Sequence, residues 1–144
     1  MKTFSLEEAQ TLVPVLESLM KNAMEAKETA ETIAQEQQLL SQRIFVNGGT
    51  LVRIAEVAKR RARQDKAIQQ VKDTLAEIDS IGVQVKDLDS GLLDFPCRLG
   101  EEIVLLCWKM GETEIQHWHT MESGFSGRKA LDERFRRPHK QKPN

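Results

Sequence analysis

The sequence predicts an α+β protein, in which a long antiparallel helical hairpin, resembling a coiled coil, is followed by a small antiparallel four-stranded β-meander. Two observations predict this fold class. From residue 5 to about residue 80, apolar residues recur mostly every three or four positions, with a lapse around Asp65, and this spacing is the period of an α-helix. After Gly82 the pattern changes to short extended runs separated by turn residues, which is typical of a meander of strands.

The first helix is expected to begin at a capping box. Ser5 and Glu8 have the spacing at which each side chain bonds the backbone N–H of the other residue. An apolar seam with steps of three and four follows and predicts a helix to about Ile44. Pro14 should kink this helix or make it restart. The seam consists of Leu12, Leu16, Leu19, Ala23, Ala26, Ala30, Ile33, Leu40 and Ile44, with Gln37 in its one polar position.

A second helix is expected after a turn at Asn47, Gly48 and Gly49, with Thr50 as its cap and its end near Ser80. Because the connection is short, the two helices should lie antiparallel. A two-helix hairpin leaves apolar surface uncovered, so we expect the sheet and a second copy of the chain to cover it. The apolar positions of the second helix are Leu51, Ile54, Ala58, Ala62, Ile68, Val71, Leu75 and Ile78.

Four strands are expected, at residues 83–86, 92–95, 103–108 and 115–119. The third is apolar on both faces and should be central, and Pro96 fits the edge or the end of the second. We expect residues 1–131 to form one domain, with the hairpin at 5–80, the meander at 83–119 and a docked loop at 120–131. Residues 132–144 are expected to be a mobile basic tail.

Composition narrows the classes of partner. The 144 residues carry a net charge of −1, which argues against a global field for nucleic acid or an anionic membrane. The basic run from Lys59 to Lys66 has no aromatic residue on which bases stack, so nucleic acid is not an expected partner. There is no signal-peptide pattern, no apolar run of the roughly 20 residues that cross a bilayer, and no disulfide framework. We therefore expect a cytoplasmic protein.

His117 and His119 are the first candidate site. They lie on one face of a strand, about 6.5 Å apart, and Glu112 precedes them in a turn, so the three side chains can bind zinc or a similar divalent metal. The alternative is that the histidines are hydrogen-bonded or exposed. If Ile115 points to the core, both histidines do too, whereas the opposite register buries Trp118 and leaves the histidines in solvent.

A zinc site that adds Cys97 and Cys107 to the two histidines is geometrically unfavourable. A hairpin that turns at Gly100 places Cys97 opposite about Val104, which leaves the two sulfurs about 10 Å apart. Two thiolates on one zinc ion lie much closer, since each bond is about 2.3 Å long. We expect both cysteines to be small buried apolar residues.

The turn at residues 124–128 is the second candidate site. Its backbone N–H groups and Arg128, with Trp118 nearby, can bind a carboxylate, a phosphate or another ligand. In the alternative, Phe125 docks as a plug and Arg128 pairs with a carboxylate. The candidate carboxylates are Glu112, Glu101 and Asp94, although the carboxylates of the sheet mostly fall in turns, where solvation and turn formation are their default roles.

No catalytic residue is predicted, because no nucleophile is held by a base and no nucleotide-binding fingerprint is present. The leading hypothesis is a non-enzymatic protein that forms a homodimer or higher oligomer, or binds a protein partner, along its hairpin. The alternative is a metal- or anion-binding protein, with or without enzymatic activity, that uses Glu112, His119 and Arg128.

A series of short motifs resembles a small prokaryotic family, the domain of unknown function 2203. The resemblance extends to about Leu131 and implies a soluble bacterial protein without an assigned activity, so it transfers no catalytic role. It also implies that His119 and Glu112 are better site candidates than His117. The motifs are Phe4-Ser5-Leu6-Glu7-Glu8-Ala9, Asp94-Phe95-Pro96, Leu106-Cys107-Trp108, Gly111-Glu112, Trp118-His119 and Gly124-Phe125-x-Gly127-Arg128.

Overall fold

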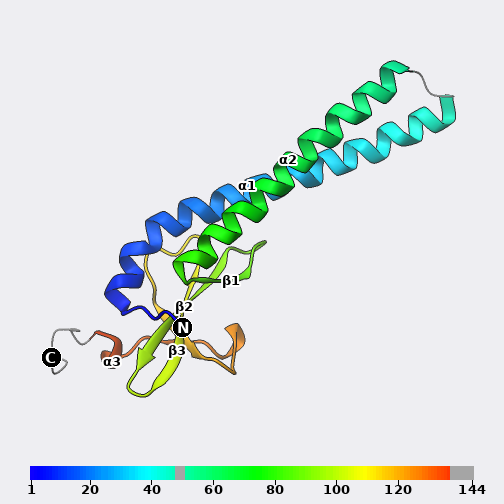
Figure 1. Ribbon diagram of the computed structural model, residues 1–144. Coiled ribbons are helices and arrows are strands. Elements are labelled where there is room, and N and C mark those ends of the chain that lie inside the picture. Colours follow the sequence, from blue (N-terminus) through cyan, green and yellow to red (C-terminus); the bar gives the residue numbers. More distant parts are fainter. Residues whose placement is uncertain (48–50, 137–144) are drawn as a thin grey trace. The chain divides into compact units, whose positions relative to one another are not determined.

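The computed structural model describes residues 1–47 and 51–136 (Figure 1). The turn expected at Gly48 and Gly49, the cap expected at Thr50, and the side chains of Ile44 and Leu51 lie outside this description. The described residues form two compact units, one combining Met1–Met20 with the chain from Ala76 onward, the other Lys21–Leu75. In order, the elements are α1 (Leu6–Asn47), α2 (Leu51–Ile81), β1 (Gln84–Asp87), β2 (Leu92–Leu99), β3 (Glu102–Lys109), β4 (His117–Thr120), η1 (Phe125–Gly127), β5 (Lys129–Ala130) and α3 (Glu133–Arg136).

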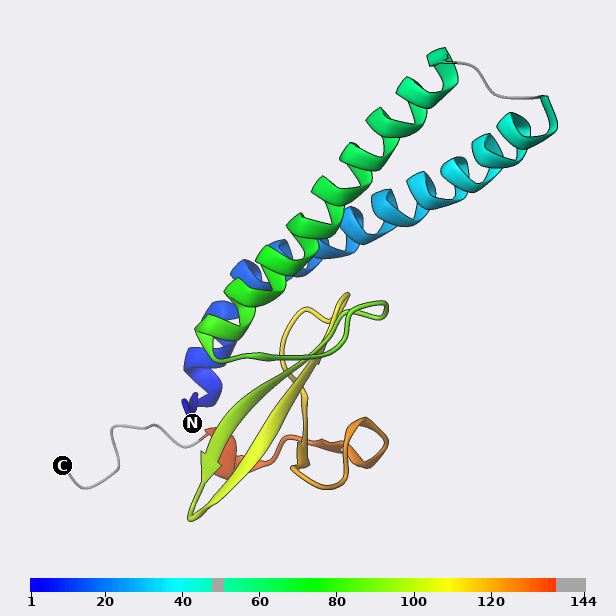
Figure 2. The ribbon, with the colours of Figure 1, turned by 45° about the vertical axis from the view of Figure 1, so that its right-hand side comes forward.

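In the unit Lys21–Leu75, α1 and α2 pack side by side (Figure 2), as the sequence predicts. Two side-chain bonds show that the helices are antiparallel. Gln37 Nε2 donates to the carbonyl oxygen of Val57 at 3.0 Å, and Gln70 Nε2 donates to Asn22 Oδ1 at 2.6 Å. The seam of α1 is confirmed here, because it buries Ala23, Ala26, Ala30, Ile33 and Leu40.

The prediction of which α2 residues form its apolar stripe is wrong in part. Ile54 is 58% exposed and Ile68 is 37% exposed, whereas Ala67, which the stripe omits, is buried. The side of α2 that meets α1 carries a polar residue as well as apolar ones. Arg60 lies on the side of α2 that meets α1, where its guanidinium donates to Glu36 Oε1 at 2.8 Å. Apolar spacing along one helix does not reveal such an ion pair.

The expected capping box is confirmed at the start of α1. Glu8 N donates to Ser5 Oγ at 3.0 Å, and Ser5 N donates to Glu8 Oε1 at 2.8 Å. These two bonds satisfy backbone donors that lack a partner within the first helical turn. The helix then runs through Pro14 to Asn47, so the restart considered at Pro14 does not occur.

The sheet is an antiparallel meander in the order β1-β2-β3-β4-β5. Four strands are as expected, and the two-residue β5 is an additional fifth. β3 lies in the middle and is buried from Val104 to Trp108 on both faces, which confirms the predicted central strand. The tight turn between β2 and β3 has Gly100 at its first position with a φ of 64°, a conformation that glycine adopts without strain.

One face of the sheet forms the core of its unit. The register pairs Phe95 with Leu106, and Leu106 with Trp118, so these three side chains share a face. They pack in one hydrophobic cluster with Phe4, Leu16, Met20, Ile78 and Trp108. Burial of this apolar face anchors α1 and the end of α2 to the sheet within the unit.

Pro96 lies inside β2, beyond the residues that pair with β1, which reach only to Asp94. Its carbonyl oxygen accepts a hydrogen bond from Phe4 N at 2.7 Å, so its backbone polar groups point away from β3. The missing N–H of the proline therefore falls where no strand needs a donor, as expected for an edge position.

After β5 the chain continues as the helix α3. The sequence predicts a mobile tail from residue 132 onward. Phe135 is buried, and its ring centroid lies 5.3 Å from that of Trp118. Residues 137–144 of the expected tail lie outside the description. Within the described residues, no helix is long and apolar enough to span a membrane.

Candidate functional site

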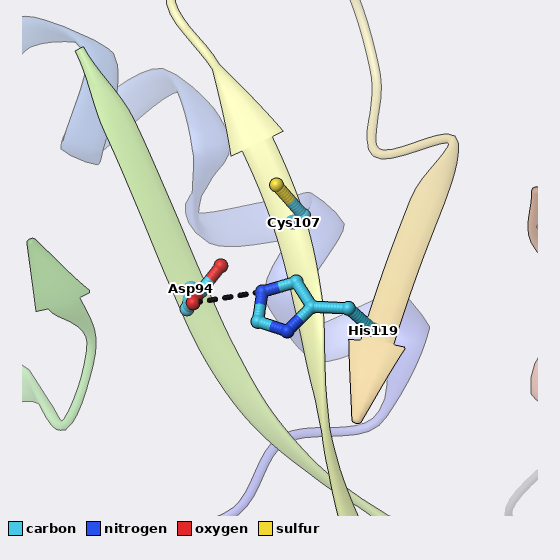
Figure 3. Close-up of side chains that lie close together, drawn as sticks. All are labelled: Asp94, Cys107 and His119. Carbon is cyan, nitrogen blue, oxygen red and sulfur yellow. Dashed lines mark hydrogen bonds and ion pairs between the residues drawn. The ribbon is translucent and has the colours of Figure 1, made fainter. Parts of the chain in front are cut away.

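The second face of the sheet carries a buried polar cluster of three side chains. Asp94, Cys107 and His119 come from β2, β3 and β4, and one ligand atom of each lies within 4.8 Å of the others (Figure 3). All three residues are buried, and Asp94 is only 1% exposed. A carboxylate, a thiol and an imidazole are thus concentrated in a site that apolar side chains ordinarily fill.

The cross-strand register brings these side chains together. Asp94 pairs with Cys107, and Cys107 pairs with His117, so their side chains lie in one row on one face. His119 lies two residues further along β4 and therefore on the same face. Its ring reaches diagonally across, so that Nε2 lies 2.9 Å from Asp94 Oδ2.

Hydrogen bonds fix the orientation of the His119 ring. Its Nδ1 lies 2.8 Å from the carbonyl oxygen of Thr120, which can only accept, so Nδ1 carries a proton. Its Nε2 therefore points at the carboxylate of Asp94, and these two groups share one further proton. This is the orientation that metal-binding histidines have, with one ring N–H donated to a carbonyl and the other nitrogen directed at the ligand site.

Asp94 is in an unfavourable environment for a carboxylate. Burial raises the pKa of Asp94, and the nearby His119 opposes this effect only in part. The Cys107 thiol acts on the carboxyl as a neighbouring donor and lowers its pKa, but no hydrogen bond of ordinary geometry reaches Oδ1 from the described residues. An unpaired buried acceptor costs about 1–3 kcal/mol, and such atoms mark places where an ion or a water molecule binds.

Cys107 is a thiol at neutral pH. Burial and, to a lesser extent, the charge of Asp94 raise the pKa of Cys107 to about 11, although Arg128 opposes both effects. Because the thiolate is the reactive form, this cysteine is not a nucleophile by itself. A cation that binds the sulfur would stabilise the thiolate.

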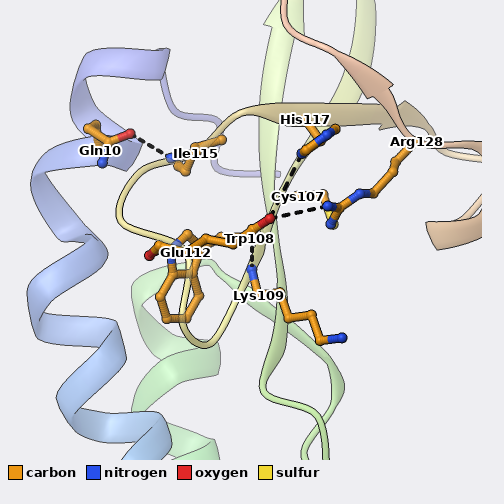
Figure 4. Close-up of polar contacts among 8 residues, drawn as sticks. All are labelled: Gln10, Cys107, Trp108, Lys109, Glu112, Ile115, His117 and Arg128. Carbon is orange, nitrogen blue, oxygen red and sulfur yellow. Dashed lines mark hydrogen bonds and ion pairs between the residues drawn. The ribbon is translucent and has the colours of Figure 1, made fainter.

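A partly exposed group of polar side chains borders the cluster (Figure 4). Glu112 Oε2 accepts from Arg128 Nη2 at 3.1 Å, which confirms one of the pairings expected for Arg128. Glu112 Oε1 accepts from Lys109 N at 2.8 Å, and the Glu112 carbonyl accepts from Trp108 Nε1 at 3.0 Å. His117 Nδ1 lies 3.9 Å from Glu112 Oε2. We call Glu112, His117 and Arg128 the rim.

The structure therefore divides the predicted metal ligands between two groups. His119 belongs to the buried cluster, whereas Glu112 and His117 belong to the rim with Arg128. Trp118, expected near Arg128, lies in the core on the opposite face of the sheet. Lys129 Nζ lies over its ring at 5.0 Å from the centroid.

The register of β4 buries Trp118, but His119 is not in solvent, because Asp94 and Cys107 surround it. Ile115 is buried as well. It precedes β4, and its N–H donates to Gln10 Oε1 at 2.9 Å (Figure 4), so its direction does not follow the alternation of the strand.

Phe125 does not form the expected plug, since it is 44% exposed. It lies instead under the guanidinium of Arg128, which is 4.7 Å from the ring centroid. Cation–π stacking keeps the ring at the surface, where Lys109 Nζ also lies 5.9 Å from its centroid.

Cys97 pairs with Val104, as expected, and belongs to the core face, whereas Cys107 belongs to the other face. This confirms that the two cysteines do not share a metal site. Asp94 lies in a strand, as the expected range 92–95 predicts, but the solvated role expected for most carboxylates of the sheet is wrong for Asp94, because this side chain is buried. The same register that places Cys97 opposite Val104 also places Asp94 opposite Cys107, so the sequence did contain the signal for this contact.

The profile of a family described as "Uncharacterized conserved protein (DUF2203)" matches residues 2–131 of this chain. The chain belongs to the DUF2203 family. The match includes the buried cluster and the rim, while α3 lies beyond it. No curated protein and no solved structure matches the chain.

We expect Asp94→Ala to destabilise this DUF2203 protein by about 1–3 kcal/mol, because the substitution leaves the buried Nε2 of His119 without its hydrogen-bond partner. Urea denaturation followed by tryptophan fluorescence measures the change. Glu114→Ala is the control, because Glu114 is an exposed carboxylate in the segment before β4. This substitution should change stability by less than about 0.5 kcal/mol. Equal effects of the two substitutions would contradict the role assigned to the Asp94–His119 contact.

Proposed function

We propose that this protein binds a divalent first-row transition metal, such as zinc, through Asp94, Cys107 and His119. One observation carries the proposal: three potential ligand atoms of different chemistry lie within 4.8 Å of one another in a buried site. Carboxylate oxygen, thiolate sulfur and imidazole nitrogen are all ligands of zinc and of its neighbours in the first transition row.

Two further details of the cluster support a metal rather than a purely structural contact. The proton on His119 Nδ1 is committed to the Thr120 carbonyl, which leaves Nε2 as the ligand atom. No hydrogen bond of ordinary geometry reaches the buried Oδ1 of Asp94 within the described structure, and a bound cation would supply a partner. With Cys107 as a thiolate, the two negative charges of the ligands would balance a divalent ion.

Three protein ligands leave one coordination position for water or another molecule, as in catalytic rather than structural zinc sites. The alternative set inferred from the sequence, Glu112, His117 and His119, is less favoured, because both oxygens of Glu112 already accept hydrogen bonds. In the proposed site the rim residues therefore lie next to the metal ligands and are not ligands themselves.

Titration of the reduced protein, produced without a histidine tag, with Co²⁺ tests the proposal. We expect one equivalent to bind with a thiolate-to-cobalt charge-transfer band in the near ultraviolet, because Cys107 becomes a ligand. Cys107→Ser should abolish the band. Asp94→Asn and His119→Gln should each weaken binding by more than about tenfold, the loss that even a change in the surrounding shell produces.

Cys97→Ser is the matched control, since Cys97 is buried on the opposite face of the sheet and should leave the band unchanged. Circular dichroism verifies that each variant folds. If the band is absent in the wild-type protein, or persists in Cys107→Ser, the metal site is wrong.

Metal affinity should increase with pH. The pKa of Cys107 is raised to about 11, so at neutral pH the metal must displace the thiol proton. Each unit of pH below that value should therefore lower the apparent affinity for Co²⁺ by at least about tenfold, because one proton is released. Competition with a chelator between pH 6 and pH 8 measures the slope. Cys107→Ser should have a slope smaller by one proton, and a pH-independent affinity would contradict thiolate ligation.

A second candidate function is self-association without catalysis, which the surface of the unit Lys21–Leu75 favours. Leu39 and Ile54 are both 58% exposed in this unit, although the expected seam predicts burial of Ile54. A helix of a second copy that lies along this hairpin would bury both side chains. Such a role requires only the helices and is compatible with a metal site elsewhere in the chain.

For this second function we expect an oligomer by light scattering at tens of micromolar protein. Ile54→Asp should reduce the mass to that of a monomer, because a charge replaces an apolar contact in the interface. Gln38→Asp adds the same charge at an exposed polar position of α1 and is the control. A wild-type protein that is monomeric would exclude self-association, and an oligomer that Ile54→Asp leaves intact would exclude this surface.

A further inference from the structure

Within the rim, an arginine already binds a carboxylate. Arg128 Nη2 binds a carboxylate oxygen, Oε2 of Glu112, at 3.1 Å. The side chains of Arg128 and Glu112 are 20% and 21% exposed, so solvent reaches this ion pair. A planar guanidinium matches carboxylate and phosphate groups, since its N–H donors form a fork with the spacing of their oxygens.

His117 adds an unused hydrogen-bonding group at the same place. Its Nδ1 is buried, has no hydrogen-bond partner within the described structure, and lies 3.9 Å from Glu112 Oε2. That distance is too long for a hydrogen bond. Glu112 therefore satisfies Arg128 but not His117, although both side chains face the same oxygen.

Arg128 also lies next to the proposed metal ligands. Its Nη1 is 3.8 Å from Cys107 Sγ. A metal bound to this sulfur at about 2.3 Å would lie no more than about 6 Å from Nη1. One oxygen of a small anion can bind the metal at about 2.0 Å while a second accepts from the guanidinium at about 2.9 Å, so a single oxyanion can reach both.

We propose that a small oxyanion, of the carboxylate or phosphate class, binds the open coordination position of the metal and Arg128 together, and that it displaces Glu112 from Arg128. This inference rests on the proposed metal site. The displacement exchanges one anionic oxygen ligand of Arg128 for another, so Arg128 keeps a counter-charge. His117 Nδ1 gains an oxygen partner that can approach more closely than Glu112 does.

The test is titration of the cobalt-loaded protein with inorganic phosphate and, separately, with acetate, followed by the visible absorption bands of cobalt. We expect a saturable shift with at least one of the two anions, and the tighter one identifies the class. Arg128→Gln should weaken anion binding by about tenfold or more, the usual effect of losing a charged hydrogen bond. Glu112→Gln should tighten it, because the internal competitor loses its charge while keeping its size.

Arg134→Gln is the matched control. Arg134 is an exposed arginine that pairs with Asp132 at 2.8 Å, so its loss should not change anion binding. Arg128→Lys keeps the charge without the fork and should give an intermediate affinity. The cobalt charge-transfer band, recorded before anion is added, verifies that each variant retains its metal site.

Two failures are distinguishable. A wild-type protein that shows no cobalt band refutes the metal site and, with it, this inference. A protein that binds cobalt but shows no saturable anion shift, or the same shift in Arg128→Gln, refutes the inference alone and leaves the metal site standing.

Discussion

β3 is buried on both faces, and the two faces require different partners. One face places Leu106 and Trp108 against apolar side chains of α1 and α2, as an ordinary core does. The other face carries Cys107 between Asp94 on one neighbouring strand and His117 on the other. Because side chains alternate strictly along a strand, the register that assembles the core also fixes the polar row. A slip of one residue would destroy both.

Local signals determined much of the fold, and they could be read from the sequence. Three such signals are the capping box at Ser5, the glycine in the turn at Gly100 and the apolar run of β3. Each involves only a few neighbouring residues, so it can be interpreted without knowing which distant residues contact it. The side of α2 that meets α1 could not be read in this way, because it also carries Arg60, which forms an ion pair with Glu36. The two-residue β5 is too short to produce a pattern.

The site was predicted less completely than the fold, for a similar reason. His119, Glu112 and Arg128 stand out as residue types, and the pairing of Arg128 with Glu112 was among the expected alternatives. Asp94 and Cys107 looked ordinary, since an aspartate near a turn and a cysteine in an apolar strand are usually structural. Their contact can be recognised only by following the hairpin register from the pair Cys97 and Val104 to the pair Asp94 and Cys107.

Stability alone is a poor explanation for the buried cluster. Replacing a buried ion pair by apolar residues of similar volume is often neutral or even stabilising. A sheet face beside Leu105 and Pro96 could have been completed with valine or leucine at the positions of Asp94 and His119. A carboxylate, an imidazole and a thiol in contact at these positions are therefore compatible with the chemical role proposed above.

The placement of the two cysteines on opposite faces of one hairpin determines how the protein tolerates oxidants. The chain contains two cysteines in total. Sulfur atoms separated by the thickness of a sheet are outside the geometry of a disulfide bond, so the two cysteines of the folded chain do not bond to each other. Oxidants react with accessible thiolates, whereas the Cys107 sulfur is buried and has a pKa raised to about 11, so the folded sheet protects it.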